Sequence, residues 1–239
     1  YRKLFQPEQK LMCGRNKDGS FDKDFNPFKW GGDFTEGCSW HYSWSVFHDI
    51  EGLIDLTGGR KAFAVKLDEV FSLPPVFDES YYKQVIHEIR EMQIMNFGQY
   101  AHGNQPIQHM IYLYAYAGEP WKTQQRVREV MERLYKPSPD GYCGDEDNGQ
   151  TSAWYVWSAL GFYPVCPGSG EVVLGAPLFK KATVTFENGK QLVINAPANS
   201  DTNRFIRDMK LNGKTYTKNY IVIEEVKRGE TIDLDMSAE

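Results

Sequence analysis

The stretch QPIQHMIYLYAYAGEPWKTQQRVREVMERLY, Gln105–Tyr135, contains two helix-like segments separated by one short break. The first segment ends at Gly118, and the second opens with Pro120, a residue that suits the first turn of a helix. Apolar residues recur at helical spacing in the second segment, and aromatic residues crowd one side of the first. The stretch therefore predicts a helical hairpin.

Segments of the same kind lie on both sides of this hairpin. WHYSWSVFHDIEGLIDLTGG ends on the helix-stopping pair Gly58 and Gly59, and RKAFAVKLDEVF begins directly after it. We expect further helices in ESYYKQVIHEIREMQ and GQTSAWYVWSALG, which cover residues 79–93 and 149–161. Aromatic-rich helices that alternate with amphipathic ones suit an α/α toroid, in which an outer ring of helices covers an inner ring.

The pattern changes after YPVCPGSG, where proline, glycine and serine concentrate. Short runs with alternating hydrophobicity follow, and the pairs Asn188-Gly189 and Asn212-Gly213 are typical of hairpin turns. These runs predict a small antiparallel β-unit. We therefore expect a mainly helical part over residues 1–166, followed by a C-terminal β-rich unit over 167–239.

The composition and charge of the chain limit the kinds of ligand and site that it can have. The chain has 239 residues, 41% of them hydrophobic, which is enough for a globular core. Its net charge of -5 and its scattered Lys and Arg residues argue against nucleic acid and favour an uncharged ligand. No apolar run is long enough to span a membrane. The four cysteines are far apart and show no CxxC spacing, which argues against a cysteine zinc site and a dense disulfide framework.

Three adjacent acids, Asp145, Glu146 and Asp147, lie in a loop that contains several glycines and runs straight into aromatic residues. One interpretation is a solvated turn that caps the next helix, because carboxylates near a helix N-terminus are favourable by about 0.3–1 kcal/mol. The glycines permit an unusual backbone path, which favours a loop built around a ligand. An EF-hand calcium loop does not fit, since Val156 stands where the bidentate Glu should be.

A second glycine-bounded loop, WGGDFTEGCSWHYSW, carries Asp33 and Glu36 and also leads into an aromatic segment. Two acidic loops at helix N-termini on one rim predict carboxyl groups that face each other across an aromatic-walled pocket. Such a pocket suits sugars, and glycoside hydrolysis needs one carboxyl to protonate the leaving oxygen and another to activate water. For the tryptophans of this loop, core packing is the alternative interpretation.

A third cluster lies in IHEIREMQIMNFGQYAHGNQPIQHM, where His87 and Glu88 are on an expected helix and Asn104 and Gln105 form the turn into the next. Amide and carboxylate oxygens together suit a hard cation, namely calcium. Zinc is a weaker alternative, because the spacing does not include HExxH and a single histidine is more often structural. The histidines that raise this alternative are His87, His102 and His109.

The motifs FTEGCSWHYSW, FGQYAHGNQPIQHMIYLYAYAGEPWKTQQRVREVM and PDGYCGDEDNGQTSAWYVWSALGFYPVCPGS resemble glycoside hydrolase family 92. This family comprises calcium-dependent exo-α-mannosidases that invert the anomeric centre. The resemblance implies an (α/α)6 catalytic barrel, release of terminal mannose from α-linked glycans as in N-glycan degradation, and calcium that contacts sugar hydroxyls and helps distort the ring.

Roles carry over by motif. The Glu of TEG implies that Glu36 is the general acid, and the two Asp residues of GDEDNGQ imply that Asp145 and Asp147 supply the base. Some members carry Glu where Gln105 stands and Asn where Asp145 stands, differences that bear on linkage preference. The calcium candidates are Asn104, Gln105 and Glu88. The expected sugar contacts are Trp30, Asp33, Trp40, His87, Glu88 and Gln150.

The resemblance also sets the expected context of the chain. Members are longer and carry an N-terminal β-sandwich domain, so we expect this chain to be the C-terminal part of the catalytic domain, with that domain as its partner. A secreted or periplasmic location is implied, although no signal segment opens the chain. Two alternatives remain open: a carbohydrate-binding or structural module that is inactive as a fragment, and another α/α-toroid glycosidase or a lyase that does not need calcium.

Overall fold

The computed structural model describes all residues from Tyr1 to Glu239 and divides into two compact units. Unit 1 comprises Tyr1–Met110 and Lys136–Thr151, and unit 2 comprises Ile111–Tyr135 and Ser152–Glu239. None of the helices combines the length and the apolar composition that a membrane crossing requires. The boundary expected between residues 166 and 167 stays a prediction; a two-residue strand, Phe162–Tyr163, already precedes it.

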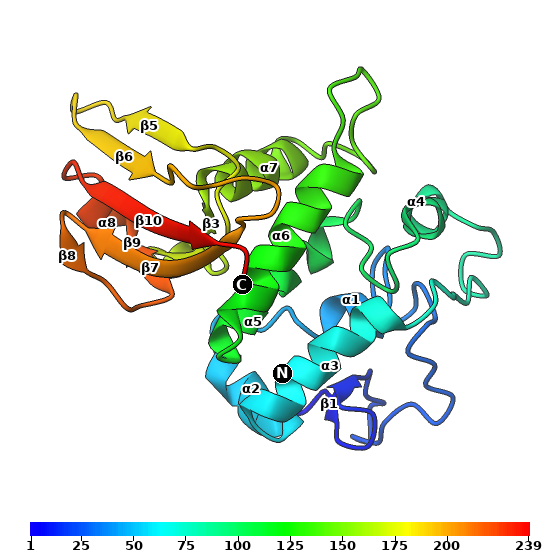
Figure 1. Ribbon diagram of the computed structural model, residues 1–239. Helices are drawn as coiled ribbons and strands as arrows, with labels where there is room; N and C mark the ends of the chain where they lie inside the picture. Colours follow the sequence, from blue (N-terminus) through cyan, green and yellow to red (C-terminus); the bar gives the residue numbers. More distant parts are fainter. The chain divides into compact units, whose positions relative to one another are not determined.

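The helices of unit 1 follow the expected segments only in part (Figure 1). The end at Gly58 is confirmed, since this residue adopts a left-handed φ of 106° after the last turn. The long helix expected from Trp40 is wrong, because Asp49 caps a new helix by accepting a hydrogen bond from the Gly52 N–H at 2.9 Å. The observed elements are β1 Phe5–Gln6, β2 Leu11–Met12, α1 Ser39–Tyr42, α2 Ile50–Thr57, α3 Arg60–Ser72, α4 His87–Met95 and the 3-10 helix η1 Gln105–Ile107.

The helix expected over residues 79–93 begins only at His87. Lys83 has a positive φ of 57°, and Ile86 is extended, so the backbone of this region is not helical before α4. As a result, Tyr81 and Tyr82 lie on a loop, where their rings pack edge to face with centroids 5.1 Å apart. This loop, rather than a helix, presents Tyr82 to the candidate site.

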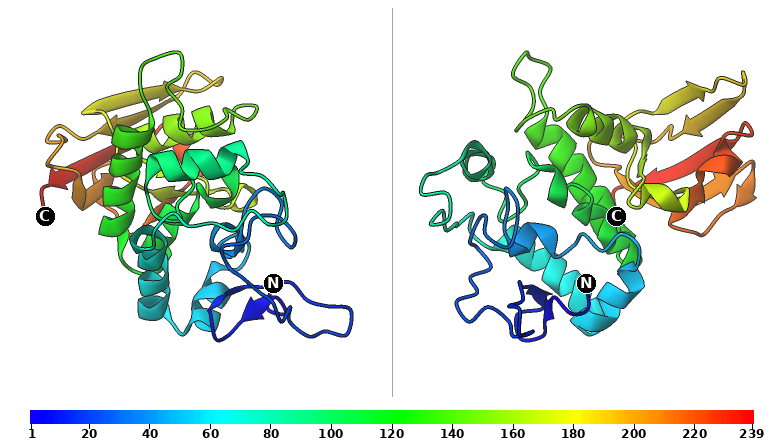
Figure 2. Two further views of the ribbon diagram at one scale, coloured as in Figure 1. Left: turned by 90° about the vertical axis from the view of Figure 1, so that its right-hand side faces the viewer. Right: turned by 180° about the vertical axis from the view of Figure 1, so that it is seen from behind.

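Unit 2 begins at Ile111, within the first segment of the expected hairpin. The segment before Gly118 forms the 3-10 helix η2, Met110–Tyr112, and the short helix α5, Leu113–Tyr116, instead of one continuous helix. The helix α6, Pro120–Leu134, is confirmed with proline in its first turn, and α7, Gln150–Leu160, is also confirmed. In Figures 1 and 2, α6 and α7 lie beside the yellow to red strands of the same unit.

Buried polar contacts connect the helix α6 to one strand and to loops of the β-region. Arg128 on α6 is almost fully buried, and its Nη1 donates to the backbone oxygen of Pro177 at 3.1 Å and to Asn199 Oδ1 at 2.9 Å. Gln124 accepts a hydrogen bond from the Ile206 N–H at 3.0 Å. The hydrophobic core of this unit is formed by strand residues such as Leu192, Ile194, Met209, Ile221, Ile232 and Leu234.

The β-region is mixed rather than antiparallel. Its five-stranded sheet has the order β5-β6-β10-β7-β8, and β10 pairs with β6 in parallel, with Thr231 opposite Val193. The antiparallel prediction is wrong for this pair because the chain reaches β10 through a long crossover instead of a hairpin. These strands are β5 Lys181–Thr185, β6 Gln191–Asn195, β7 Phe205–Leu211, β8 Lys214–Thr215 and β10 Thr231–Ser237.

Both predicted hairpin turns are confirmed. β5 pairs with β6 across Asn188-Gly189, and β7 pairs with β8 across Asn212-Gly213, where φ is 51° and 75° as a tight hairpin turn requires. A separate antiparallel sheet has the order β3-β4-β9. Its strands and the neighbouring short helices are β3 Phe162–Tyr163, η3 Pro167–Ser169, β4 Glu171–Leu174, β9 Tyr220–Val222 and α8 Ile223–Val226.

Candidate active site

The backbone of Glu36 is held on both sides. Its N–H donates to the hydroxyl of Tyr82 at 3.0 Å, and its carbonyl oxygen accepts a hydrogen bond from the side-chain amide of Asn104. Glu36 itself is exposed and has a positive φ of 48°, a conformation that few non-glycine residues adopt. The two hydrogen bonds therefore hold the backbone of Glu36 in this conformation, and with it the starting point of the carboxylate side chain.

Close packing brings the tyrosine loop against this acidic loop. A Cβ on Gly31 would lie 2.3 Å from the Tyr81 ring and 2.9 Å from the Tyr82 ring. Any larger residue at this position would push the two rings away, since real Cβ atoms essentially never approach so closely. Gly31 thus permits the approach that lets Tyr82 reach the Glu36 N–H.

The three adjacent acids divide into two kinds. Glu146 accepts a hydrogen bond from the Gly149 N–H at 2.8 Å and so caps the start of α7. Asp145 and Asp147 are exposed, and Asp147 has a left-handed φ of 51°. The Thr151 hydroxyl donates to the backbone oxygen of Asp145 at 2.9 Å. The capping interpretation therefore holds for the middle acid, and it leaves the two flanking carboxylates for other chemistry.

The turn at residues 102–105 touches both acidic loops within unit 1. Its Asn104 holds the carbonyl of Glu36, and its Gly103 packs directly on Gly144. A Cβ on Gly144 would lie 2.6 Å from the Gly103 Cα, and one on Gly103 would lie 2.9 Å from the oxygen of Cys143. Backbone contact of this kind requires glycine on both sides. The turn thus brings the loop of Glu36 and the loop of Asp145 to one place in the fold.

A glutamine pair supports the same arrangement. The side-chain amide of Gln150, at the start of α7, donates to Gln108 Oε1 at 3.2 Å. The buried Gln108 in turn donates to the backbone oxygen of His102 at 3.0 Å and to the Thr151 hydroxyl at 3.4 Å. Gln150, expected as a sugar contact, is therefore placed beside the turn at residues 102–105.

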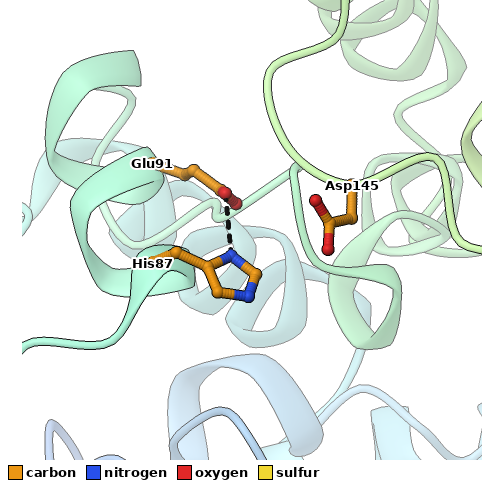
Figure 3. A group of neighbouring side chains, drawn as sticks. All are labelled: His87, Glu91 and Asp145. Atoms are coloured by element: carbon orange, nitrogen blue, oxygen red, sulfur yellow. Dashed lines mark hydrogen bonds and ion pairs between the residues drawn. The ribbon is translucent and has the colours of Figure 1, made fainter.

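His87 meets the carboxylates of Glu91 and Asp145 between α4 and the acidic loop (Figure 3), and Glu88 also contacts it. His87 Nδ1 lies 2.9 Å from Glu91 Oε1, and its Nε2 lies 3.3 Å from Glu88 Oε1. One ligand atom from each of His87, Glu91 and Asp145 lies within 4.8 Å of the other two. The hydrogen bond with Glu91 and the nearby carboxylates raise the pKa of His87, whereas burial raises the pKa of Glu91.

Several polar atoms of α4 and of the turn at residues 102–105 are buried without a hydrogen-bond partner in the protein. They include one carboxylate oxygen each of Glu88 and Glu91 and the side-chain amide nitrogen of Gln105. Carboxylate oxygens in this state are costly unless a cation or donor satisfies them, and calcium binds such oxygens. Turning the Gln105 amide would put its oxygen where the unpaired nitrogen now lies. The unpaired oxygen of Glu88 suits a hard cation, whereas Asn104 and Gln105 as ligands of the same ion stay predictions.

Other expected sugar contacts have different surroundings. Trp30 and Trp40 are buried, with 0% and 4% exposure; Trp30 packs edge to face on His41, and Lys66 Nζ lies 4.3 Å from the Trp40 ring centre. Asp33 is exposed, and its Oδ2 accepts a hydrogen bond from the Gly14 N–H at 3.1 Å. The roles of these residues in sugar binding stay predictions.

The histidines do not gather into a three-histidine zinc site. His102 is buried against the Tyr100 hydroxyl at 2.9 Å, and His109 Nε2 contacts the backbone oxygen of Trp44 at 2.9 Å. Burial lowers the pKa of His102 to about 3 and that of His109 to about 4. Both are therefore neutral structural residues, and His87 is the histidine that lies among carboxylates.

Sequence reasoning missed Tyr82 and Glu91. Glu91 stands four residues after His87, a spacing that places two side chains on one helix face, so this signal was present in the sequence. Tyr82 gave no such signal, because its contact with Glu36 joins loops that are 46 positions apart.

Known proteins identify the family of the chain. The profile of the glycosyl hydrolase family 92 catalytic domain matches residues 1–238. Two solved structures from Bacteroides thetaiotaomicron cover 100% of the chain: the GH92 inverting mannosidase BT2199, with 51% identity and a TM-score of 0.87, and the GH92 α-mannosidase BT3965 in complex with mannoimidazole, with 34% identity and a TM-score of 0.89. A curated protein of Arthroderma benhamiae, named an uncharacterized secreted glycosidase, is 27% identical over 208 residues, or 85% of the chain.

The chain spans only part of these relatives. It covers 32% of BT2199, 31% of BT3965 and 24% of the fungal protein. The match to the catalytic-domain profile nevertheless extends over nearly the whole sequence. The chain belongs to glycosyl hydrolase family 92 and corresponds to a part of its catalytic domain.

Proposed function

We propose that this chain provides the acid, base and metal-binding residues of an inverting, calcium-dependent exo-α-mannosidase. One observation carries the proposal: the turn at residues 102–105 holds the Glu36 loop through Asn104 and contacts the Asp145 loop through Gly103. The two acidic loops, far apart in sequence, are thus anchored to one element. Two related structures are those of an inverting mannosidase and an α-mannosidase, which supports the same substrate class.

In the proposed reaction, Glu36 protonates the glycosidic oxygen while Asp145 and Asp147 orient and deprotonate a water molecule on the opposite face of the sugar. The bond between C1 and the leaving oxygen breaks as the bond between C1 and the water oxygen forms. An inverting pair needs carboxyl groups roughly 6.5–9.5 Å apart so that the water fits between them. The exposed positions of all three side chains are compatible with their reaching a bound sugar.

Calcium would be held by oxygen atoms of Asn104, Gln105 and Glu88. When bound, it would contact sugar hydroxyls and favour a distorted ring. Asn104 is suited to this role because its amide nitrogen is engaged by the Glu36 carbonyl, which directs its amide oxygen elsewhere. The buried, unpaired oxygen of Glu88 supplies the negative charge that a cation requires.

The wider context follows from the family. We infer that the helices of the chain form part of an (α/α)6 barrel and that an N-terminal β-sandwich domain of the same protein helps close the site. The substrate class is the terminal α-mannoside of a glycan, and the fungal relative named a secreted glycosidase supports a secreted or periplasmic location. A neutral substrate also agrees with the modest net charge of -5.

The complete enzyme tests the proposal. Methyl glycosides of the α-1,2, α-1,3, α-1,4 and α-1,6 mannobioses are incubated with it, so that the leaving sugar keeps a fixed anomer, and proton NMR follows the anomer of the first free mannose. We expect β-mannose first from at least one linkage, loss of turnover after EDTA treatment and recovery with added calcium. Release of α-mannose first, or full activity after exhaustive chelation, would contradict the mechanism.

A further inference from the structure

We propose that His87, Glu91 and Asp145 form a binding site for a transition metal ion of the zinc type, and that zinc bound there inhibits hydrolysis. The inhibition rests on the proposed role of Asp145 as part of the catalytic base. The site is distinct in chemistry from the proposed calcium site, because it includes an imidazole nitrogen, a ligand that calcium rarely accepts.

The geometry needs little rearrangement. Zinc binds nitrogen and carboxylate oxygen at about 2.0–2.2 Å, so two of its ligands lie roughly 3–3.5 Å from each other in a tetrahedral site. His87 Nδ1 and Glu91 Oε1 are already 2.9 Å apart, and all three ligand atoms lie within 4.8 Å of one another. A zinc ion can replace the proton between the first pair, while the exposed Asp145 side chain moves inward to complete the set.

The ligands are also well placed on the fold. His87 and Glu91 are four residues apart on α4, so they share one helix face, and Asp145 approaches from the acidic loop (Figure 3). The Glu91 side chain is only 21% exposed and one of its oxygens is buried without a partner, whereas the His87 side chain is 60% exposed and open to ions from solution. The contact of Gly144 with Gly103 keeps the acidic loop beside the helix.

The functional consequence follows from the shared aspartate. A carboxylate bound to zinc is a much weaker base, and its oxygen is no longer directed at the attacking water. One Asp, one Glu and one His make a three-ligand set that leaves the fourth position to water, unlike the closed four-ligand sites of structural zinc. Zinc bound there takes Asp145 out of catalysis; Asn104 and Gln105 lie outside its ligand set, and the third proposed calcium ligand, Glu88, meets that set at His87 Nε2, 3.3 Å away.

The experiment uses the complete enzyme saturated with calcium. Isothermal titration calorimetry measures zinc binding, and the hydrolysis rate is followed over the same zinc range. We expect one zinc ion per chain at this site and a rate that falls as it fills. Glu91→Gln and His87→Gln should each weaken zinc binding at least tenfold and raise the inhibitory zinc concentration in parallel, with every variant compared with its own zinc-free rate.

His48→Gln is the matched control, because His48 is an exposed histidine outside the cluster, and it should bind zinc and be inhibited as the parent enzyme is. Circular dichroism confirms that both variants are folded. If folded Glu91→Gln and His87→Gln bind zinc as tightly as the parent enzyme, the proposed site is wrong. Zinc that binds through these residues without slowing hydrolysis overturns the inhibition. A complete enzyme that hydrolyses no mannobiose contradicts the proposed function instead, and calorimetry still decides the zinc site.

Discussion

The side-chain amide of Asn104 donates a hydrogen bond to the backbone carbonyl of Glu36, 68 positions earlier in the chain. A proposed calcium ligand and the proposed general acid are therefore in direct contact through the backbone of the acid. On the other side of the same residue, Tyr82 accepts the Glu36 N–H. The position of the acid thus depends on two residues that do not themselves take part in proton transfer.

Tyr82→Phe tests this dependence, because it removes the hydroxyl and keeps the ring that packs on Gly31. The Glu36 N–H would lose its partner, and one hydrogen bond contributes about 0.5–1.5 kcal/mol. If the bond positions the acid for the transition state, we expect kcat of the complete enzyme to fall about threefold to tenfold, with little change in KM or in melting temperature.

Tyr81→Phe is the control, since Tyr81 packs on the same glycine and is 57% exposed, but does not contact the Glu36 N–H. This variant should keep the parent rate. Equal losses in the two variants would show that the tyrosine loop acts only as a packing element.

Two acids of the same loop should affect different properties of the enzyme, Glu146 its stability and Asp147 its activity. Glu146→Ala removes the carboxylate that accepts the Gly149 N–H, so we expect the free energy of unfolding to fall by about 1 kcal/mol, as for the loss of other helix caps. Glu146→Gln should recover much of this loss. Asp147→Asn should leave stability nearly unchanged, because Asn tolerates the left-handed backbone of this position.

Urea unfolding followed by circular dichroism, together with rates per folded molecule, distinguishes the two acids. An Asp147→Asn variant that unfolds as easily as Glu146→Ala while keeping its rate would mean that both acids are structural.

Local sequence signals predicted the parts of the fold that local interactions decide. Pro120 fixed the start of α6, Gly58 the end of α2, and Asn212-Gly213 a hairpin turn. The parallel pairing of β10 with β6 depends on which strand fills the gap beside β6, a tertiary choice that alternation alone does not encode. The helix expected from residue 79 is a similar case. Its apolar spacing is present in the sequence, but the backbone turns at Lys83 and the helix begins only at His87.

The candidate site divides in the same way. The acids Glu36, Asp145 and Asp147 could be singled out because their glycine-bounded loops are unusual in sequence. Nothing in the sequence indicated that Glu146 would cap the helix while its two neighbours stay exposed. This division arises from the left-handed backbone at Asp147 and the residues after it, which turns Glu146 back toward the Gly149 N–H.

Buried neutral histidines predict acid sensitivity of unit 1. Burial holds the pKa of His41 and His102 at about 3 and that of His109 at about 4, whereas an unfolded chain binds the proton near pH 6.5. The unfolded state therefore takes up more protons below pH 6.5. Each histidine should lower the free energy of unfolding by up to about 1.4 kcal/mol per pH unit between pH 6.5 and its folded pKa.

Denaturant unfolding at pH 7.5, 6 and 5 measures how steeply the free energy of unfolding falls with decreasing pH. His109→Gln keeps a donor for the Trp44 carbonyl but cannot be protonated, so its stability should fall less steeply with acid than that of the parent chain. His48→Gln, at an exposed histidine, should leave the slope unchanged. Identical slopes in the parent and the His109 variant would show that carboxylates alone cause the acid effect.

The choice of leaving group separates the proposed acid from the proposed base. If Glu36 protonates the departing oxygen, Glu36→Gln should cripple cleavage of a mannobiose, whose alcohol leaves poorly, yet spare much of the activity on an activated aryl mannoside that departs without a proton. Asp147→Asn should slow both substrates together, because the attacking water stays unactivated whatever group leaves. Steady-state rates of the complete enzyme on the two substrates measure the difference. The assignment fails if both variants show the same substrate dependence, whereas a purely structural role for either loop predicts lower thermal stability with rates per folded molecule nearly unchanged.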